Sequence, residues 1–195
     1  IFGSDIGDYY WFLILPIALM SFPNGFNIVA GYDGLEVSIS IIMCSFYIFM
    51  AVFTLNSQIL FLTLPMLAVL LAFLIFNWSP SQLIGGNTFS FSFGLLLVII
   101  PMIETFKVVL PFFFGLHLVE FYFKLRYKGK TTIFGKIDEE GYFNPPAQIK
   151  SIGHLLPKYF KLNEKGITVA LSLIQFSLCI IGFFFWIIYS GFYQL

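Results

Sequence analysis

The sequence predicts an all-α fold, a polytopic bundle of transmembrane helices. Of its 195 residues, 59% are hydrophobic and 10% are charged, whereas about a quarter of the residues in a typical soluble domain are charged. The mean hydropathy is +0.92, and six apolar stretches approach or reach the length that an α-helix needs to cross a bilayer. These observations predict an integral membrane protein that forms one transmembrane domain over residues 1–195.

The six predicted spans differ in length, and four of them contain a proline. They run over Tyr10–Phe22, Leu35–Thr54, Ile59–Phe76, Phe89–Ile103, Phe106–Phe123 and Ile167–Tyr189. Because proline lacks an amide hydrogen, Pro16, Pro65 and Pro111 are expected to bend their helices where neighbouring helices stabilise the bend. Cys44 and Cys179 also lie inside spans, which favours small buried side chains over a disulfide or a metal pair.

The basic residues predict how the spans are oriented. Nine of the ten Lys and Arg residues lie between Lys124 and Lys165, and loops rich in these residues face the cytoplasm. Counting spans back from this loop places residues 23–34 and 77–88 on the same side. The sequence therefore predicts three cytoplasmic loops, at 23–34, 77–88 and 124–165.

The first of these loops is polar and rich in glycine for a connection between two spans. Polar backbone at the edge of a bilayer is tolerated where protein or water satisfies it, so such a segment usually lines a site. The amides of Asn24 and Asn27 can donate and accept hydrogen bonds, and their oxygens can bind a hard cation. The alternative is an ordinary helix stop and turn, although a turn needs only two or three such residues.

Two motifs in these loops resemble the cytoplasmic signatures of the polyprenyl-phosphate N-acetylhexosamine-1-phosphate transferases. Residues 24–36, Asn-Gly-Phe-Asn-Ile-Val-Ala-Gly-Tyr-Asp-Gly-Leu-Glu, look most like the eukaryotic and archaeal UDP-GlcNAc:dolichyl-phosphate GlcNAc-1-phosphate transferases. Residues 76–89 begin Phe-Asn-Trp-Ser-Pro and end Gly-Gly-Asn-Thr-Phe, similar to the Phe-Asn-x-x-Pro and Gly-Asp-Thr element of that branch. The resemblance implies a fold of about ten spans. The chain would be its C-terminal part, lacking the family's paired-aspartate loop and inactive alone.

The same resemblance implies a magnesium-dependent phosphoryl transfer in which a lipid phosphate attacks a UDP-sugar and UMP is released. Asn27 would be a metal ligand, Asn24 a polar neighbour of the diphosphate, and Asp33 a contact near the uracil. The family's Gly-Asp-Thr aspartate, a second metal ligand, is Asn87 in this chain. An amide oxygen still binds magnesium or manganese, but less strongly than a carboxylate. Three interpretations stay open: an active variant with a weaker metal site, an inactive homologue, or an altered substrate or metal preference.

The long loop departs from the family's basic-His-basic cluster, which grips the diphosphate. Arg126, Lys128 and Lys130 supply positive charge for substrate binding, and His154 is the candidate for the missing imidazole if the loop folds back. The alternative is that these basic side chains only satisfy topology and attract anionic lipid.

Three further polar residues, His117, Glu120 and Lys124, lie on one face of a helix that approaches the cytoplasm. They either line the nucleotide cleft or form an interfacial stripe that holds the helix end at the headgroups. Glu139 and Glu140 predict a solvated loop or a small hairpin.

The resulting hypothesis is a membrane glycosyl-1-phosphate transferase that moves GlcNAc-1-phosphate from UDP-GlcNAc to dolichyl or polyprenyl phosphate, the first step of lipid-linked glycan assembly. The lipid phosphate would be reached through the bilayer between bent helices. Membrane lipids and a second copy in a homodimer are the other expected partners, and no nucleic acid is expected. The location would be an archaeal or bacterial cell membrane, or the endoplasmic reticulum membrane of a eukaryote, with the active face cytoplasmic. The alternatives are a catalytically inactive homologue and a small-solute transporter, which would more naturally place polar residues at mid-membrane.

Overall fold

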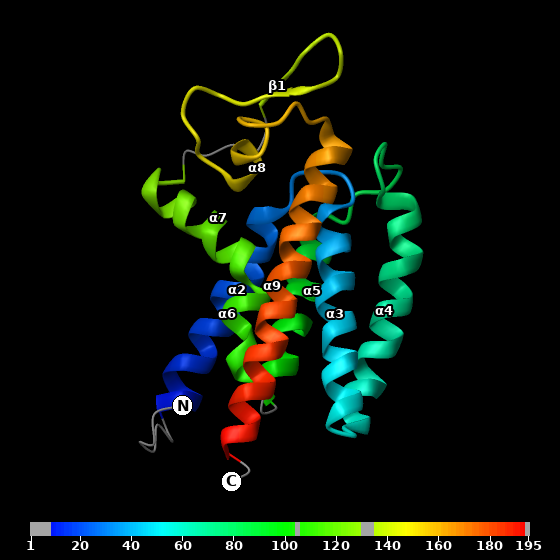
Figure 1. Ribbon diagram of the computed structural model, residues 1–195, viewed down its shortest axis with the longest axis vertical. Helices are drawn as coiled ribbons and strands as arrows, with labels where there is room; N and C mark the ends of the chain where they lie inside the picture. Colours follow the sequence, from blue (N-terminus) through cyan, green and yellow to red (C-terminus); the bar gives the residue numbers. More distant parts are fainter. Residues whose placement is uncertain (1–8, 104–105, 130–134, 194–195) are drawn as a thin grey trace.

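The computed structural model describes residues 9–103, 106–129 and 135–193 and has the shape of a helical bundle capped by loops at one end (Figure 1). The N-terminal helix begins with a π-helical turn, η1. In chain order the elements are η1 (Tyr10–Ile14), α2 (Leu15–Val29), α3 (Leu35–Phe53), α4 (Ser57–Asn77), α5 (Gly86–Ile103), the 3₁₀ turn η2 (Lys107–Val109), α6 (Leu110–Phe113), α7 (Gly115–Arg126), β1 (Lys136–Ile137), β2 (Phe143–Asn144), α8 (Ile152–Leu155) and α9 (Glu164–Tyr193).

The all-α membrane fold is confirmed, but the described residues contain fewer spans than the six predicted. Among them, four helices are long and apolar enough to cross a membrane: Phe12–Val29, α3, α4 and Glu164–Gly191. A fifth span exists if the pair Lys107–Phe113 and Gly115–Arg126, bent by 61°, is counted as one. The remaining predicted span, α5, is a shorter apolar helix. The difference arises because hydropathy reports how apolar a stretch is and not whether its helix is continuous.

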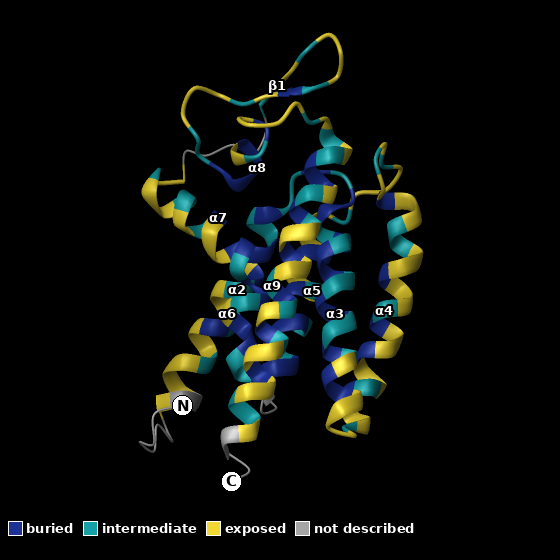
Figure 2. Cartoon of the chain, in the orientation of Figure 1, coloured by how far each residue is buried: buried dark blue, intermediate teal, exposed yellow. Residues whose placement is uncertain are grey.

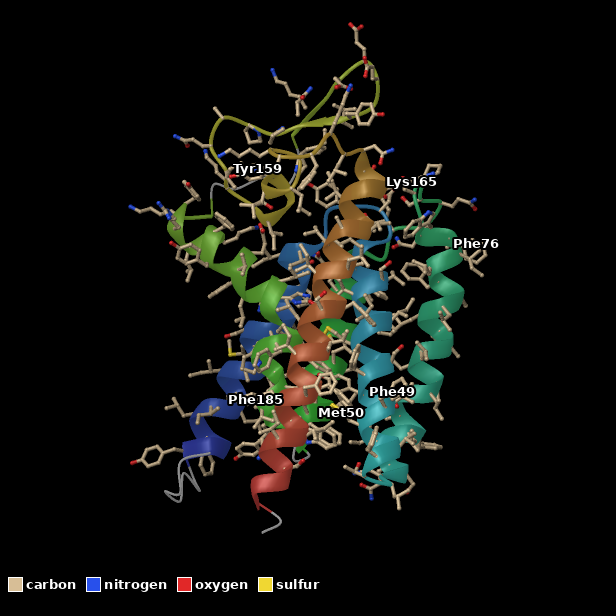
Figure 3. All side chains as sticks on the ribbon, viewed as in Figure 1. Phe49, Met50, Phe76, Tyr159, Lys165 and Phe185 are labelled. Atoms are coloured by element: carbon tan, nitrogen blue, oxygen red, sulfur yellow. The ribbon has the colours of Figure 1, made fainter. Side chains whose placement is uncertain are left out.

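Many large apolar side chains are exposed, and others are buried in the core of the bundle. Figure 2 shows the exposed residues in yellow and the buried ones in dark blue. Phe76 at the end of α4 points away from the bundle (Figure 3). Inside, the Tyr47 hydroxyl donates to the Leu97 carbonyl at 2.9 Å and so ties α3 to α5. Such a surface suits a lipid solvent, in which exposed apolar groups cost nothing and buried polar groups need partners.

The predicted end of the first span at Phe22 is wrong. Helix α2 continues through Pro23 to Val29 and keeps both asparagines of the signature within its last turns. Proline at this point loses one amide donor, but close packing of α2 on α5 retains the helix: a Cβ placed on Gly94 of α5 would lie 3.0 Å from the Pro23 Cα. The non-helical part of the predicted loop is therefore only residues 30–34.

The break between α6 and α7 has an identifiable stabilising contact. Phe113 is the last residue of α6, so its carbonyl is one of the groups that a helix end leaves without a partner. The fully buried Gln175 of α9 donates to this carbonyl from Nε2 at 2.7 Å. A side chain of another helix thus takes the place of the missing helical hydrogen bond, as in other broken membrane helices.

Residues 135–163, which precede α9, fold over the end of the bundle. Strands β1 and β2 pair antiparallel around Gly141, which has a φ of +83°, so the predicted small hairpin at Glu139 and Glu140 is confirmed. After the hairpin, the short helix α8 packs against α7. The segment therefore returns to the membrane helices before α9 begins.

Candidate functional site

Asp33 joins three parts of the chain at the capped end of the bundle. Its carboxylate accepts two hydrogen bonds from Ser81, from the backbone N–H at 2.9 Å and from the hydroxyl at 2.7 Å. Its own N–H donates to Glu164 at 3.1 Å, and its carbonyl accepts from the Thr168 hydroxyl at 3.0 Å. The polar loop after α2, the loop after α4 and the start of α9 are therefore held together by one residue.

The turn that presents Asp33 depends on a glycine. Gly34 has a φ of +76°, a conformation that side chains disfavour, and it caps the N-terminus of α3. A Cβ on this residue would lie 2.9 Å from the Trp78 ring. Two residues later, Glu36 accepts a hydrogen bond from the Ser90 hydroxyl of α5 at 2.5 Å. Residues 24–36 are thus hydrogen-bonded to α5 through Glu36 and to the loop between α4 and α5 through Asp33.

A cavity of about 480 Å³ opens at this end, next to the Asp33 cluster. Residues from all three predicted loops line it: Tyr32, Ser79, Ile137, Gly141, Phe143, Asn163, Glu164 and Lys165. Figure 3 shows Lys165 at the start of α9, where the helix meets the loops. The volume lies within the range of about 300–1,000 Å³ that is usual for small-molecule sites.

Tyr32 forms a buried wall of this cavity. Its ring meets Phe143 edge to face, with 5.8 Å between the ring centroids, and it packs against the backbone of Gly153, where a Cβ would lie 2.7 Å from Cε2 of the ring. Burial raises the pKa of Tyr32 above its ordinary range, and the negative charges of Glu120 and Glu164 raise it further. The phenol is therefore protonated at neutral pH.

A second, apolar groove of about 470 Å³ lies between α2 and α7. Aliphatic and aromatic side chains line most of it, and His117 and Gly25 close one side. The His117 ring stacks on Phe26 with 4.9 Å between centroids and is only 2% exposed. His117 therefore fits neither interpretation of this helix face: it does not line the 480 Å³ cavity, and it is buried rather than placed at the headgroups.

The three predicted asparagines lie near the same end of the bundle. Asn27 is half-buried near the end of α2, and Asn87 is exposed in the first turn of the neighbouring helix α5. Asn24 is exposed and donates from its amide to the Met20 carbonyl at 2.6 Å, one turn earlier in the same helix. The Asn24 amide nitrogen is thus already hydrogen-bonded within its own helix.

The predicted basic cluster is only partly assembled. Arg126 is exposed and donates to the Tyr122 hydroxyl at 3.1 Å, and Lys128 is exposed; Lys130 lies outside the described residues. His154 is 1% exposed, and its Nδ1 accepts from the Lys150 N–H at 3.4 Å. The loop does fold back, but it buries the imidazole. Of the eight predicted site residues, the seven that the structure describes do not line the 480 Å³ cavity.

These residues fit a divalent cation in part. In the described residues, no three His, Cys, Asp or Glu side chains form a group that could hold a metal ion. Asn27 and Asn87 offer neutral amide oxygens, while Asp33 uses both carboxylate oxygens for Ser81. Magnesium usually takes one or two carboxylates and completes its shell with water and substrate phosphates. The described donors therefore supply part of such a shell.

Several residues that build this end of the molecule escaped the sequence analysis. Ser81, Glu164 and Thr168 bind Asp33, and Ser90 binds Glu36. Glu36 is the last residue of the first signature motif, so the motif already pointed to it, but its partner Ser90 lies 54 residues away in the sequence. The others carry no sequence signal, because serine, threonine and glutamate are ordinary residues in loops and helix starts.

Comparison with known proteins agrees with the signature motifs. The chain is 31% identical over 169 residues to a Saccharolobus solfataricus protein provisionally named UDP-N-acetylglucosamine–dolichyl-phosphate N-acetylglucosaminephosphotransferase, covering 86% of this chain and 52% of the relative. A Schizosaccharomyces pombe protein of that name is 27% identical over 173 residues, covering 82% and 37%. A phospho-N-acetylmuramoyl-pentapeptide-transferase of Dictyoglomus turgidum is 26% identical over 111 residues, covering 57% and 36%.

The chain thus spans about half the length, or less, of these relatives. The family model described as glycosyl transferase family 4 matches residues 1–105, a range that includes the Asp33 turn, the Ser81 loop and the first turn of α5. The match covers more than half of the chain, so the chain belongs to glycosyl transferase family 4.

Proposed function

We propose that this chain forms part of a membrane glycosyl-1-phosphate transferase that moves GlcNAc-1-phosphate from UDP-GlcNAc to dolichyl or polyprenyl phosphate and releases UMP. The observation that carries the proposal is the junction at Asp33, where the two motif-bearing loops and the start of α9 are hydrogen-bonded beside a cavity of about 480 Å³. The names of the related proteins support the same donor and acceptor.

The two cavities suit two substrates of different solubility. The cavity at the loop end carries polar and charged groups from Ser79, Asn163, Glu164 and Lys165, which suits a nucleotide sugar. The groove between α2 and α7 is lined almost entirely by apolar groups, which suits an isoprenoid chain entering from the bilayer past the bent α6–α7 pair. A lipid phosphate in the groove would meet a nucleotide sugar at the loop end.

Phosphoryl transfer depends mainly on positioning and on stabilising charge on the phosphate oxygens. In this proposal Asn27 and Asn87 would hold a magnesium or manganese ion, which would neutralise phosphate charge. Asn24 would hydrogen-bond the diphosphate, Asp33 would shape the uracil side, and Arg126, Lys128 and Lys130 would supply positive charge to the phosphates. The buried His154 is left out of this set. The active face would be cytoplasmic, in a cell membrane or in the endoplasmic reticulum membrane, and the assembly a homodimer.

The test is exchange of labelled UMP into UDP-GlcNAc by the full-length protein in detergent. Exchange should require both the lipid phosphate and a divalent cation. An absence of exchange under these conditions contradicts the proposal for the natural protein.

The neutral residue Asn87 specifically favours a second candidate, an inactive homologue. Asn87→Asp adds one negative charge at the cation and should lower the magnesium concentration needed for half-maximal activity. If the natural protein is inactive and Asn87→Asp is active, the metal site has decayed and the homologue interpretation holds.

A further inference from the structure

The side chain of Glu120 on α7 is fully buried, with 0% of its surface exposed. Removing a carboxylate from water is strongly unfavourable unless hydrogen bonds compensate. Its Oε2 accepts the N–H of Ile152 at 2.7 Å and the hydroxyl of Ser151 at 3.0 Å. An ionisable residue in a membrane helix is expected to have a function, and the partners of this one lie 31 and 32 residues further along the chain.

The Ser151 hydroxyl extends this contact by one residue. It accepts the N–H of Gly153 at 3.1 Å, so the carboxylate and the hydroxyl together bind two consecutive backbone amides. The segment 151–153 is thereby held against α7. All three of its residues are buried.

Gly153 connects the segment 151–153 to the cavity, because its backbone packs against Tyr32. Its backbone lies so close to the Tyr32 ring that a Cβ would overlap the hydroxyl and approach Cε2 to 2.7 Å. Tyr32 in turn lines the 480 Å³ cavity together with Phe143. A continuous set of contacts therefore runs from Glu120 through residues 151–153 to the wall of the cavity.

We infer that Glu120 is a positioning residue for the nucleotide-sugar cavity, because its carboxylate fixes residues 151–153 against Tyr32. The inference rests on the proposed function, in which this cavity takes the nucleotide sugar. Glu120 acts only through Tyr32, so the effect should fall on the donor and not on the lipid phosphate. The groove between α2 and α7 is lined by His117, Leu118 and Phe121 of the same helix, but not by Glu120.

The experiment compares the Michaelis constants for UDP-GlcNAc and for the lipid phosphate in the full-length protein. Glu120→Leu removes both hydrogen bonds to the carboxylate and should raise the KM for UDP-GlcNAc by about tenfold or more. The kcat and the KM for the lipid phosphate should change by less than about threefold. A variant that merely unfolds in part loses kcat instead, because fewer molecules are active.

Two further variants act on the same set of contacts. Oε1 of Glu120 is buried and has no hydrogen-bond partner among the described residues. The hydrogen bonds to Ser151 and Ile152 therefore depend on Oε2 alone. Glu120→Gln keeps a carbonyl oxygen and should restore the donor KM to within about threefold of the natural value. Gly153→Ala should raise it as Glu120→Leu does. Glu139→Leu, on the exposed hairpin, is the matched control and should change neither constant.

Hydrogen exchange of the Ile152 and Gly153 amides gives a readout that does not depend on activity. Both amides should exchange at least about tenfold faster in Glu120→Leu, because their acceptors are lost or displaced. Unchanged exchange, or folded Glu120→Leu and Gly153→Ala variants with a donor KM within twofold of the natural value, would overturn the inference. If Glu120→Leu does not fold, Glu120→Gln and Gly153→Ala decide. A natural protein that neither binds UDP-GlcNAc nor exchanges UMP into it contradicts the proposed function instead. The hydrogen-exchange rates of the two amides still test whether Glu120 holds residues 151–153.

Discussion

Replacing Asp33 by alanine tests whether this residue holds the loop end of the bundle together. The substitution removes the two hydrogen bonds that the carboxylate accepts from Ser81 at 2.7 and 2.9 Å. A hydrogen bond to a charged group contributes about 1.5–3 kcal/mol, and we halve this because Asp33 and Ser81 are half-buried, so water can replace part of each bond. The expected loss of stability for the two hydrogen bonds together is about 1.5–3 kcal/mol.

Unfolding of the protein can be measured through its two buried free thiols, Cys44 and Cys179. A thiol-reactive fluorophore in a thermal ramp should therefore detect when the bundle opens. In a chain of this size 1 kcal/mol shifts Tm by roughly 2–4 °C, so Asp33→Ala should lower Tm by about 3–12 °C.

A double-mutant cycle separates this role from a contact with substrate. Ser81→Ala removes only the hydroxyl, and the pair should be coupled by about 1 kcal/mol through the bond between the Ser81 hydroxyl and Asp33. The reasoning is refuted if Asp33→Ala melts within 1 °C of the natural protein or if the two substitutions are additive. A raised KM for UDP-GlcNAc at unchanged Tm would favour the uracil contact.

Three other substitutions have expected effects that follow from single contacts. Gln175→Leu leaves the Phe113 carbonyl without its donor at the break between α6 and α7 and should cost about 1–3 kcal/mol, measured as a lower Tm in detergent; an unchanged Tm would mean that the break does not need this contact. Gly34→Ala adds a Cβ at a φ of +76° and 2.9 Å from the Trp78 ring, so it should lower the free energy of unfolding by about 1–3 kcal/mol. A Tm equal to that of the natural protein would contradict this expectation. Lys161→Ala removes an ion pair whose side chains are 61% and 68% exposed, so the Tm should move by less than about 2 °C; a larger drop would contradict the assignment of this pair as a solvent-screened contact.

Much of the fold was predictable because membrane helices must satisfy their own backbone hydrogen bonds and expose apolar side chains to lipid. Helices α3 and α4 lie within a few residues of the predicted Leu35–Thr54 and Ile59–Phe76. The first span was misjudged because proline, asparagine and glycine predict a helix end, whereas packing of α2 on α5 keeps residues 23–29 helical. Local propensity is a weak determinant when tertiary contacts oppose it.

The site was predictable to a smaller extent. The two motifs located the segments that meet, and family membership follows from the same residues. Their partners were not predictable, since the hydrogen bonds of Asp33 reach residues 48, 131 and 135 positions away. The sequence also placed His154 among the substrate-binding groups, but the fold buries it behind the hairpin.

By itself, the sequence determined that this protein is an all-α membrane protein of the glycosyl transferase family 4 type, because composition sets the solvent and short motifs identify the family. Only the tertiary structure decided which polar groups are used for folding and which remain available. Asp33 binds Ser81, Gln175 binds the broken helix, and Glu120 binds the returning loop. The physical reason is that a polar group removed from water requires a partner, and in this chain the partners come from distant segments that only folding brings together.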